Sequence, residues 1–327
     1  MNILADILSG TILFAVPLLL VALGGMFSER SGVINIALEG IMLIGALTSC
    51  LFLSALEKAG LGMHPQLAML LAVLIAAATG VLFSMLLAFA AIKLKADQTI
   101  GGTALNMLAP AVGIVLTWAI QGQGQTTILI PTWTRITQES LGLSSGQDFF
   151  SRLVFKSLFL TTPIAILLLV AAVVLLYKTK LGLRLRACGE HPQAADSVGI
   201  NVYRMRYLGV GISGFLGGIG GLAYSLAAGS GYQSTVQGYG FLALAVMIFG
   251  NWKPLNILGA SLFFALFKIV GSYAGSIPFL PKFETVKSSE YIYLMLPYIV
   301  TMILLVLTSK RSRAPKAEGI PYDKGGR

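Results

Sequence analysis

The chain has 327 residues, of which 56% are apolar and 11% charged, and its mean hydropathy is +0.83. These values exclude an ordinary soluble domain and indicate a protein whose solvent is the lipid bilayer. The net charge of +10 does not indicate nucleic-acid binding, because Lys and Arg stand between and after apolar runs, as in membrane proteins with a fixed orientation.

Apolar runs long enough to cross a bilayer follow one another along most of the chain. A spanning helix needs about 20 mostly apolar residues. Four runs fill the first third, and a polar connection over 121–156, read as an external loop, separates them from the rest. The run at 239–249 is too short to cross alone. We predict an all-α, polytopic transmembrane helix bundle of about nine spans, with runs at 7–26, 33–53, 67–92, 101–120, 158–177, 207–228, 239–249, 255–274 and 291–307.

The two chain ends and the cysteines carry further expectations. The N-terminus lacks the cationic start of a cleavable signal, so we expect it to be retained. A single transmembrane domain over 1–309 is followed by a basic tail over 310–327, which we read as a solvated anchor. Cys50 lies in an apolar run and Cys188 in a basic loop, so a disulfide between them is not expected, and neither has metal-ligand spacing.

The distribution of Lys and Arg predicts the orientation, because cytoplasmic loops are enriched in them. Six lie in the loop 178–206 and six in the tail, so both segments are predicted to be cytoplasmic. Counting spans backwards places Arg30, Lys93 and Lys95 inside and the N-terminus outside. In this topology sixteen of the 23 basic residues are cytoplasmic and six are external.

The loop 178–206 contains a short helix with a clear start and end. Pro192 suits the first turn, Gly199 is placed to end it, and Asn201 can cap the helix that follows. A short helix held between two spans can be pushed by a soluble partner and can pass that motion to both, as a mechanical lever does. The alternative is an ordinary loop held by its positive charge.

Four segments resemble permease subunits of ABC importers for sugars, branched-chain amino acids and nucleosides. The loop segment GEHPQAADSVGINV (189–202) resembles the part of those permeases that faces the ATPase, and GFLALAVMIFGNWKPL (240–255) resembles a segment late in their chains. ADQTIGGTALN (96–106) is a further match. SERSGVINIALEG (28–40) is similar to the signature of the nucleoside-type branch. The resemblance covers about residues 7 to 307.

The resemblance implies a type II ABC importer-like fold and a set of partners. These are an ATP-binding subunit at the cytoplasmic face, a second related permease subunit, typically a different chain in the nucleoside branch, and an external substrate-binding protein or lipoprotein. The chain has no Gly-x-x-x-x-Gly-Lys-Ser/Thr phosphate loop, so ATP is expected to be hydrolysed by the partner. The residues expected to couple this chain to the ATPase are Gly189, Glu190, Pro192, Ala194, Ala195, Gly199 and Ile200.

Polar residues at membrane depth are the candidates for the substrate pathway, because they are costly there unless they line a cavity or find a partner. Asn35, Glu39 and Met42 are spaced to share one helical face, and Thr103 with Asn106 forms a second candidate pair. The alternative for these residues is hydrogen bonding between helices that only holds the bundle together.

Two further features lie inside apolar runs. Lys268, a further candidate for the substrate pathway, needs a partner, and we predict an ion pair with Glu39. Snorkelling of the Lys268 amine to the membrane surface is the alternative. The run around 214–221 holds two small-xxx-small patterns, which favour close helix packing, or a flexible gate, at Gly214, Gly217, Gly218 and Gly221.

Several function classes remain open. An enzyme has little support, because His64 and His191 are the only histidines and neither lies in a catalytic arrangement. An ion-coupled secondary transporter or channel fits the hydropathy equally well, but it does not need the lever at 189–200. We therefore predict a nucleoside permease in a bacterial inner membrane, with sugars or branched-chain amino acids as the alternative substrates and no cofactor or metal bound by this chain.

Overall fold

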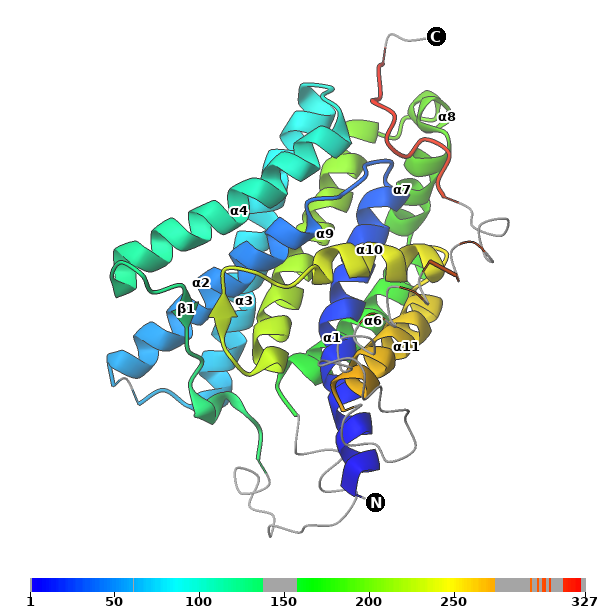
Figure 1. The fold of residues 1–327 in the computed structure, drawn as a ribbon. Helices are drawn as coiled ribbons and strands as arrows, with labels where there is room; N and C mark the ends of the chain where they lie inside the picture. The colour runs from blue at the N-terminus through cyan, green and yellow to red at the C-terminus, as the bar shows by residue number, and fades with distance from the viewer. Residues whose placement is uncertain are drawn as a thin grey trace.

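The computed structural model is a bundle of long helices (Figure 1). It describes residues 2–60, 62–137, 158–273 and 314–324, together with single helical positions at 295, 299, 302, 303 and 306. The described helices are α1 (Asn2–Arg30), α2 (Leu38–Lys58), α3 (Pro65–Ala88, continued by a π-helical turn over Phe89–Lys93), α4 (Gln98–Gln121), α6 (Thr161–Lys178), α7 (Lys180–Glu190), α8 (Pro192–Ser197), α9 (Val202–Ala228), α10 (Tyr239–Phe249) and α11 (Pro254–Ser272).

Seven of these helices are long and apolar enough to cross a membrane, namely α1, α2, α3, α4, α6, α9 and α11. The eleven-residue α10 is a shorter apolar helix, as its run in the sequence predicts. The predicted ninth run at 291–307 lies mostly outside the described residues, so the count of nine stays a prediction.

Helix α9 lies at the centre of the bundle, packed against α1, α2 and α3 (Figure 1). Its glycines make this packing possible. A Cβ atom at Gly221 would clash with the Met42 carbonyl oxygen of α2, and one at Gly218 would clash with the Ala76 carbonyl oxygen of α3. A Cβ at Gly217 would lie 2.9 Å from Ile41 Cγ2 of α2, and one at Gly214 would clash with the side chain of Ser84 of α3. The small residues therefore lie at the contacts of α9 with its neighbours.

The backbone between α9 and α10 is not helical. Gly229 ends α9 in the left-handed conformation, at φ 70°, and Gly238 has φ 77° directly before α10. Between them β2 (Tyr232–Gln233) pairs antiparallel with β1 (Thr127–Ile128), which belongs to the connection after α4. This two-stranded pairing is not evident in the sequence, and it brings the start of α10 back to the middle of the bundle (Figure 1).

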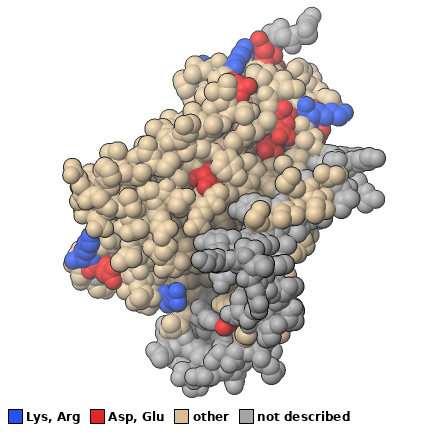
Figure 2. Space-filling model, viewed as in Figure 1, with Lys and Arg blue, Asp and Glu red and all other residues tan. Residues whose placement is uncertain are grey.

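The two ends of the bundle differ in what they carry. The helices α7 and α8 and the residues 314–324 lie at one end, which we call the α8 end, and α1 begins at the opposite end (Figure 1). Lys93 and Lys95 also belong to the α8 end, because the Lys95 amine lies 3.1 Å from Asp323 Oδ2. Figure 2 shows that the charged side chains visible on this face gather near the ends and leave most of its middle uncharged.

Candidate functional site

The segment 178–206 forms helices at nearly every position. Thr179 caps α7, since its Oγ1 accepts a hydrogen bond of 3.1 Å from Gly182 N. Pro192 begins α8, and Gly199 follows it at φ 83°. The side chain of Asn201 then caps α9 by accepting a 3.0 Å hydrogen bond from Arg204 N. The short helix predicted from Pro192 and Gly199 is therefore present, and it lies between two capped helices.

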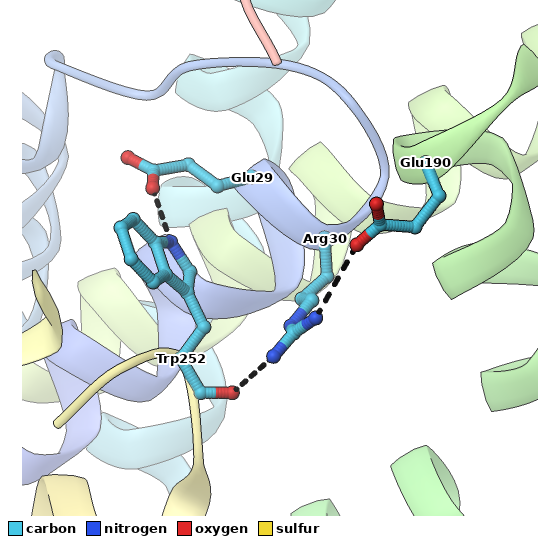
Figure 3. A network of polar contacts seen from close by, with 4 residues as sticks. All are labelled: Glu29, Arg30, Glu190 and Trp252. Atoms are coloured by element: carbon cyan, nitrogen blue, oxygen red, sulfur yellow. Dashed lines mark hydrogen bonds and ion pairs between the residues drawn. The ribbon is translucent and has the colours of Figure 1, made fainter. Parts of the chain in front are cut away.

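A polar network joins the end of α1 to α7 and to the turn between α10 and α11 (Figure 3). The indole Nε1 of Trp252 donates a hydrogen bond of 2.5 Å to Glu29 Oε2. Arg30 Nη2 donates to the Trp252 carbonyl oxygen at 3.2 Å, and Arg30 Nη1 lies 3.9 Å from Glu190 Oε1. Trp252 itself is buried and has a left-handed backbone, at φ 52°. These contacts connect three segments far apart in the sequence.

The predicted coupling residues divide into buried and exposed positions. Gly189 lies directly against the Arg30 backbone, where a Cβ atom would clash with the carbonyl oxygen. Pro192 and Ala195 are buried, whereas Ala194 and Gly199 are exposed; Glu190 and Ile200 are intermediate. One side of α8 thus packs onto the bundle and the other side faces outward, and the end of α7 directly before it lies against α1 at Gly189 and Arg30.

The Glu39 side chain binds the start of α10. Its Oε1 accepts a hydrogen bond of 2.8 Å from Gly238 N, and its Oε2 accepts one of 2.7 Å from Gly240 N. The first backbone N–H groups of a helix have no partner within the helix, and an anion there is favoured by the helix dipole. Glu39 remains half-buried. Figure 2 shows one acidic patch in the uncharged middle of this face, over the region where α2 and α10 begin.

The predicted shared face of Asn35, Glu39 and Met42 is wrong. Helix α2 begins only at Leu38, so Asn35 lies in a non-helical stretch before it. Asn35 and Met42 are fully buried, and Asn35 Nδ2 donates a 2.8 Å hydrogen bond to Ser213 Oγ. Helical spacing does not apply across a residue outside the helix.

Side chains of α4 explain why the stretch before α2 is not helical. Asn106 Oδ1 accepts from Gly40 N and Asn106 Nδ2 donates to the Ile36 carbonyl oxygen, both at 2.8 Å. Gln98 Oε1 accepts from Ile34 N at 2.7 Å. These bonds satisfy buried backbone groups that a helix would otherwise satisfy. Asn106 therefore holds helices together, whereas the other member of the pair, Thr103, is exposed and bonds only within α4, to the Thr99 carbonyl oxygen.

The predicted ion pair between Glu39 and Lys268 does not form, although both residues lie in the described part of the chain. The Lys268 amine lies over three aromatic rings, 4.1 Å from the centroid of Tyr239, 4.7 Å from Phe14 and 5.7 Å from Tyr224. Ring faces attract cations through their quadrupole, and the attraction grows when water is excluded. The partners of the Lys268 amine are thus aromatic rings and not the Glu39 carboxylate that we predicted from the sequence.

Comparison with known proteins identifies the family of this chain. Residues 7–307 match the family described as the permease component of the branched-chain amino acid transport system. The chain belongs to this family. It is a multi-pass membrane protein and a transport subunit, as the family and the seven apolar helices indicate. No solved structure gives a significant match.

Several curated relatives of this permease are named after the substrates that they transport. The guanosine ABC transporter permease protein NupQ of Bacillus subtilis is 43% identical over all of this chain and 99% of its own. The nucleoside ABC transporter permease protein NupC of Lactococcus lactis is 39% identical over 99% of this chain and 98% of its own. The glucose ABC transporter permease protein TsgB13 of Haloferax volcanii is 27% identical over 79% of this chain and 67% of its own.

The prediction that the tail of the permease is a solvated anchor is wrong for residues 314–324, which we call the C-terminal strap. The strap packs against the α8 end: Ala317 N donates a hydrogen bond of 2.8 Å to the Gly189 carbonyl oxygen, and Arg206 Nη1 donates one of 2.9 Å to the Ile320 carbonyl oxygen. Burial raises the pKa of the Glu318 carboxyl to about 7. The prediction considered only the basic composition of the tail, and it did not consider that the small and aromatic residues between the charges could pack inward.

Sequence reasoning missed several residues that organise this permease. Trp252 was visible only as part of a resemblance, and its role as a donor to Glu29 needs the contact between α1 and the turn after α10. Arg206 was counted as one of the basic residues of a cytoplasmic loop, yet it is 1% exposed. The start of α4 at Gln98 could be predicted from the sequence, because Asp97 is a suitable helix cap. The bond of Gln98 with Ile34 could not, because it depends on the packing of α4 against the stretch before α2.

The described part of the permease offers no group of three or more His, Cys, Asp or Glu side chains arranged to hold a metal ion. Its two thiols, Cys50 and Cys188, are free and buried. Burial raises the pKa of Cys188 to about 11, so this thiol is protonated and unreactive at neutral pH.

Proposed function

We propose that this chain is the permease subunit of an ATP-binding cassette importer for nucleosides. The observation that carries the proposal is the helix α8, which faces outward on one side and packs on its other side against α7 and α9. The end of α7 is in turn joined to α1 by the contact of Glu190 with Arg30. This arrangement suits a subunit that is moved by a soluble partner. The names of the two relatives with full-length similarity, a guanosine permease and a nucleoside permease, support the substrate class.

The α8 end faces the cytoplasm in this proposal, in the inner membrane of a bacterium. The excess of Lys and Arg in the segment 178–206, the C-terminal tail and the connection at Lys93 and Lys95 supports this orientation. The C-terminus is then cytoplasmic and the N-terminus external, because α1 begins at the opposite end of the bundle (Figure 1).

The substrate pathway runs along the face where α2, α4 and α10 meet. Glu39 is half-buried at the middle of this face and Thr103 is exposed on α4, and polar groups at membrane depth favour a water-filled cavity or a protein neighbour over lipid. The first turn of α10 also exposes Phe241, at 50%, which offers an aromatic surface. A second, related permease chain covers this face and closes the pathway.

The remaining partners follow from the same proposal. An ATP-binding subunit docks at the cytoplasmic face and hydrolyses ATP, since the sequence has no phosphate loop. An extracytoplasmic binding protein or lipoprotein delivers the nucleoside. This chain binds no cofactor of its own. Motion of α8 reaches α1 through Gly189 and Arg30, and reaches the turn after α10 through the hydrogen bond of Arg30 with Trp252.

Import by the full assembly in proteoliposomes tests this function. We expect uptake of radiolabelled guanosine to require ATP on the α8 side and the binding protein on the other side, and to be competed by other unlabelled nucleosides. Competition by glucose or leucine, with none by nucleosides, would replace the substrate class and leave the permease assignment intact. Uptake that continues without ATP and stops when ion gradients collapse would identify an ion-coupled carrier.

A further inference from the structure

The C-terminal strap is built into the α8 end by both its backbone and its side chains. Pro315, Ala317 and Tyr322 are buried, whereas Lys316 and Ile320 are exposed. The strap therefore has an inner side, which packs onto the bundle, and an outer side.

The inner side joins the strap to α8 and α9. Tyr322 is 5% exposed and belongs to one apolar cluster with Cys188, Ala195 and Val202. Its ring meets that of Tyr203 edge-on, with the centroids 5.3 Å apart. Because Ala195 is the buried apolar residue in the middle of α8, the strap rests on the inner side of that helix.

Polar contacts attach the strap to two more segments, α7 and the connection after α3, and again to α9. Ala317 bonds to Gly189 at the end of α7, and the Lys95 amine lies 3.1 Å from Asp323 Oδ2. Arg206 of α9 is almost fully buried, and Ile320 supplies the carbonyl oxygen that its Nη1 binds. Burying a guanidinium costs free energy unless its N–H groups find acceptors, and the strap supplies the acceptor for Nη1, whereas Nε and Nη2 have no hydrogen-bond partner among the described residues.

The outer side of the strap continues the outward surface of α8. Val198, directly after α8, is 74% exposed, and Ile320 on the strap is 57% exposed. Neither residue lies in a membrane-spanning helix, so acyl chains do not cover them. The two residues belong to segments that pack against each other through Tyr322 and Ala195, and exposed aliphatic side chains outside the membrane favour a protein interface. Figure 1 shows the strap running beside α7 and α8.

The strap and α7 also carry exposed basic side chains. Lys316 and Lys324 of the strap and Lys180 and Arg184 of α7 are all exposed. A partner that fits this surface presents an apolar groove with carboxylates at its rim, because opposite charges at a rim steer association and fix the register.

We propose that the strap and α8 together form the docking surface for the ATP-binding subunit, so that this partner grips the C-terminus of the permease as well as α8. The inference rests on the proposed function. In this arrangement the strap moves with α8 and carries the motion to α9 through Arg206 and to the end of α3 through Lys95, in addition to the route through α1.

Binding of the purified ATP-binding subunit to the permease in nanodiscs tests the proposal, with Kd measured for three single variants. Ile320→Asp changes only an exposed side chain, and we expect it to raise Kd at least tenfold, as Val198→Asp on α8 does. Leu129→Asp is the matched control, because Leu129 is 73% exposed in the connection after α4, away from the strap; its Kd should equal that of the wild type.

Lys316→Glu provides a second variant whose folding is not in question. It should raise Kd several-fold at low salt and less at high salt, since salt screens exposed charges. Wild-type affinity for both Ile320→Asp and Lys316→Glu, with weakened binding for Val198→Asp, would overturn the role of the strap. ATP-dependent nucleoside uptake by the wild-type assembly is measured in parallel, so that a failure of the proposed function can be distinguished from a failure of the docking proposal.

Discussion

Trp252 and Glu29 lie 223 residues apart in the chain and are joined by a hydrogen bond of 2.5 Å between the indole Nε1 and Oε2. Both side chains are buried, so the bond fixes the turn after α10 to the end of α1. Trp252→Phe replaces the buried indole by a smaller aromatic ring and removes the N–H donor to Glu29, and we expect the lost donor to cost about 1–3 kcal/mol in stability, with a further loss from the gap left by the smaller ring.

Thermal unfolding of the purified permease in detergent measures this loss. Trp118→Phe is the matched control, because Trp118 is 42% exposed, and it should leave the midpoint unchanged. Equal midpoints for Trp252→Phe and wild type would show that the bond contributes nothing.

Close packing of α9 predicts that Gly221→Ala is destabilising. The new methyl group would overlap the Met42 carbonyl oxygen, and overpacking of this kind costs about 1–3 kcal/mol. Gly259→Ala on α11 is the control, since a Cβ atom there meets nothing within 4 Å; it should leave the unfolding midpoint unchanged or raise it. The packing role fails if the two alanine variants unfold at the same temperature.

Replacement of Glu39 should give a graded response. Glu39→Gln keeps one acceptor for the two N–H groups of Gly238 and Gly240, and Glu39→Ala keeps none. Each amide left without a partner costs about 1–3 kcal/mol, so we expect stability to fall in the order Glu, Gln, Ala. Thr103→Val, which alters an exposed hydroxyl bonded within its own helix, should be near neutral. An alanine variant as stable as wild type would refute the capping role.

The aromatic surroundings of Lys268 predict tolerance of an uncharged side chain. Lys268→Met fills the same space and gives up a cation–π attraction of about 0.5–2 kcal/mol, so we expect a folded protein with a modestly lower midpoint. Lys268→Glu places an anion against the negative ring faces and should prevent purification of folded protein. Lys253→Met, at an exposed position, controls for loss of charge, and unfolding of Lys268→Met would show that the positive charge itself is essential to the fold.

Docking of the C-terminal strap should depend on pH through Glu318. Burial raises the pKa of this carboxyl from 4.5 to about 7, so the docked strap favours the protonated form. Its contribution is complete below pH 4.5 and is lost as the pH rises to about 7. Glu29 of α1 bonds to the same carboxyl, and Arg206 and the Lys95–Asp323 pair are the neighbouring charged groups on the other contacts of the strap.

A spin label on Lys316→Cys reports the docked fraction, because Lys316 is exposed and both native thiols are buried. Its mobile fraction should increase between pH 4.5 and 7. The same label combined with Glu318→Gln should show no such increase, and an identical pH profile in both proteins would assign the titration to another group.

The membrane class, the short helix at Pro192 and the position of most spans could be predicted from the sequence alone. These depend on local properties, namely the length of apolar runs, the fixed φ of proline and the side-chain cap of Asn201. The cap and the helix ends are correct to within a few residues for the same reason.

The partners of the polar residues at membrane depth, in contrast, depend on tertiary contacts. The sequence places Glu39 and Lys268 in apolar runs, and opposite charge made their pairing the simplest prediction. The backbone N–H groups at the start of α10 and the three aromatic rings satisfy them instead. These partners lie far away in the chain, 201 residues for Gly240 and Glu39 and 254 residues for Phe14 and Lys268, and no local pattern specifies which buried polar group meets which neighbour. The strap was missed for the same reason, because its inward side is defined by the surface on which it lies.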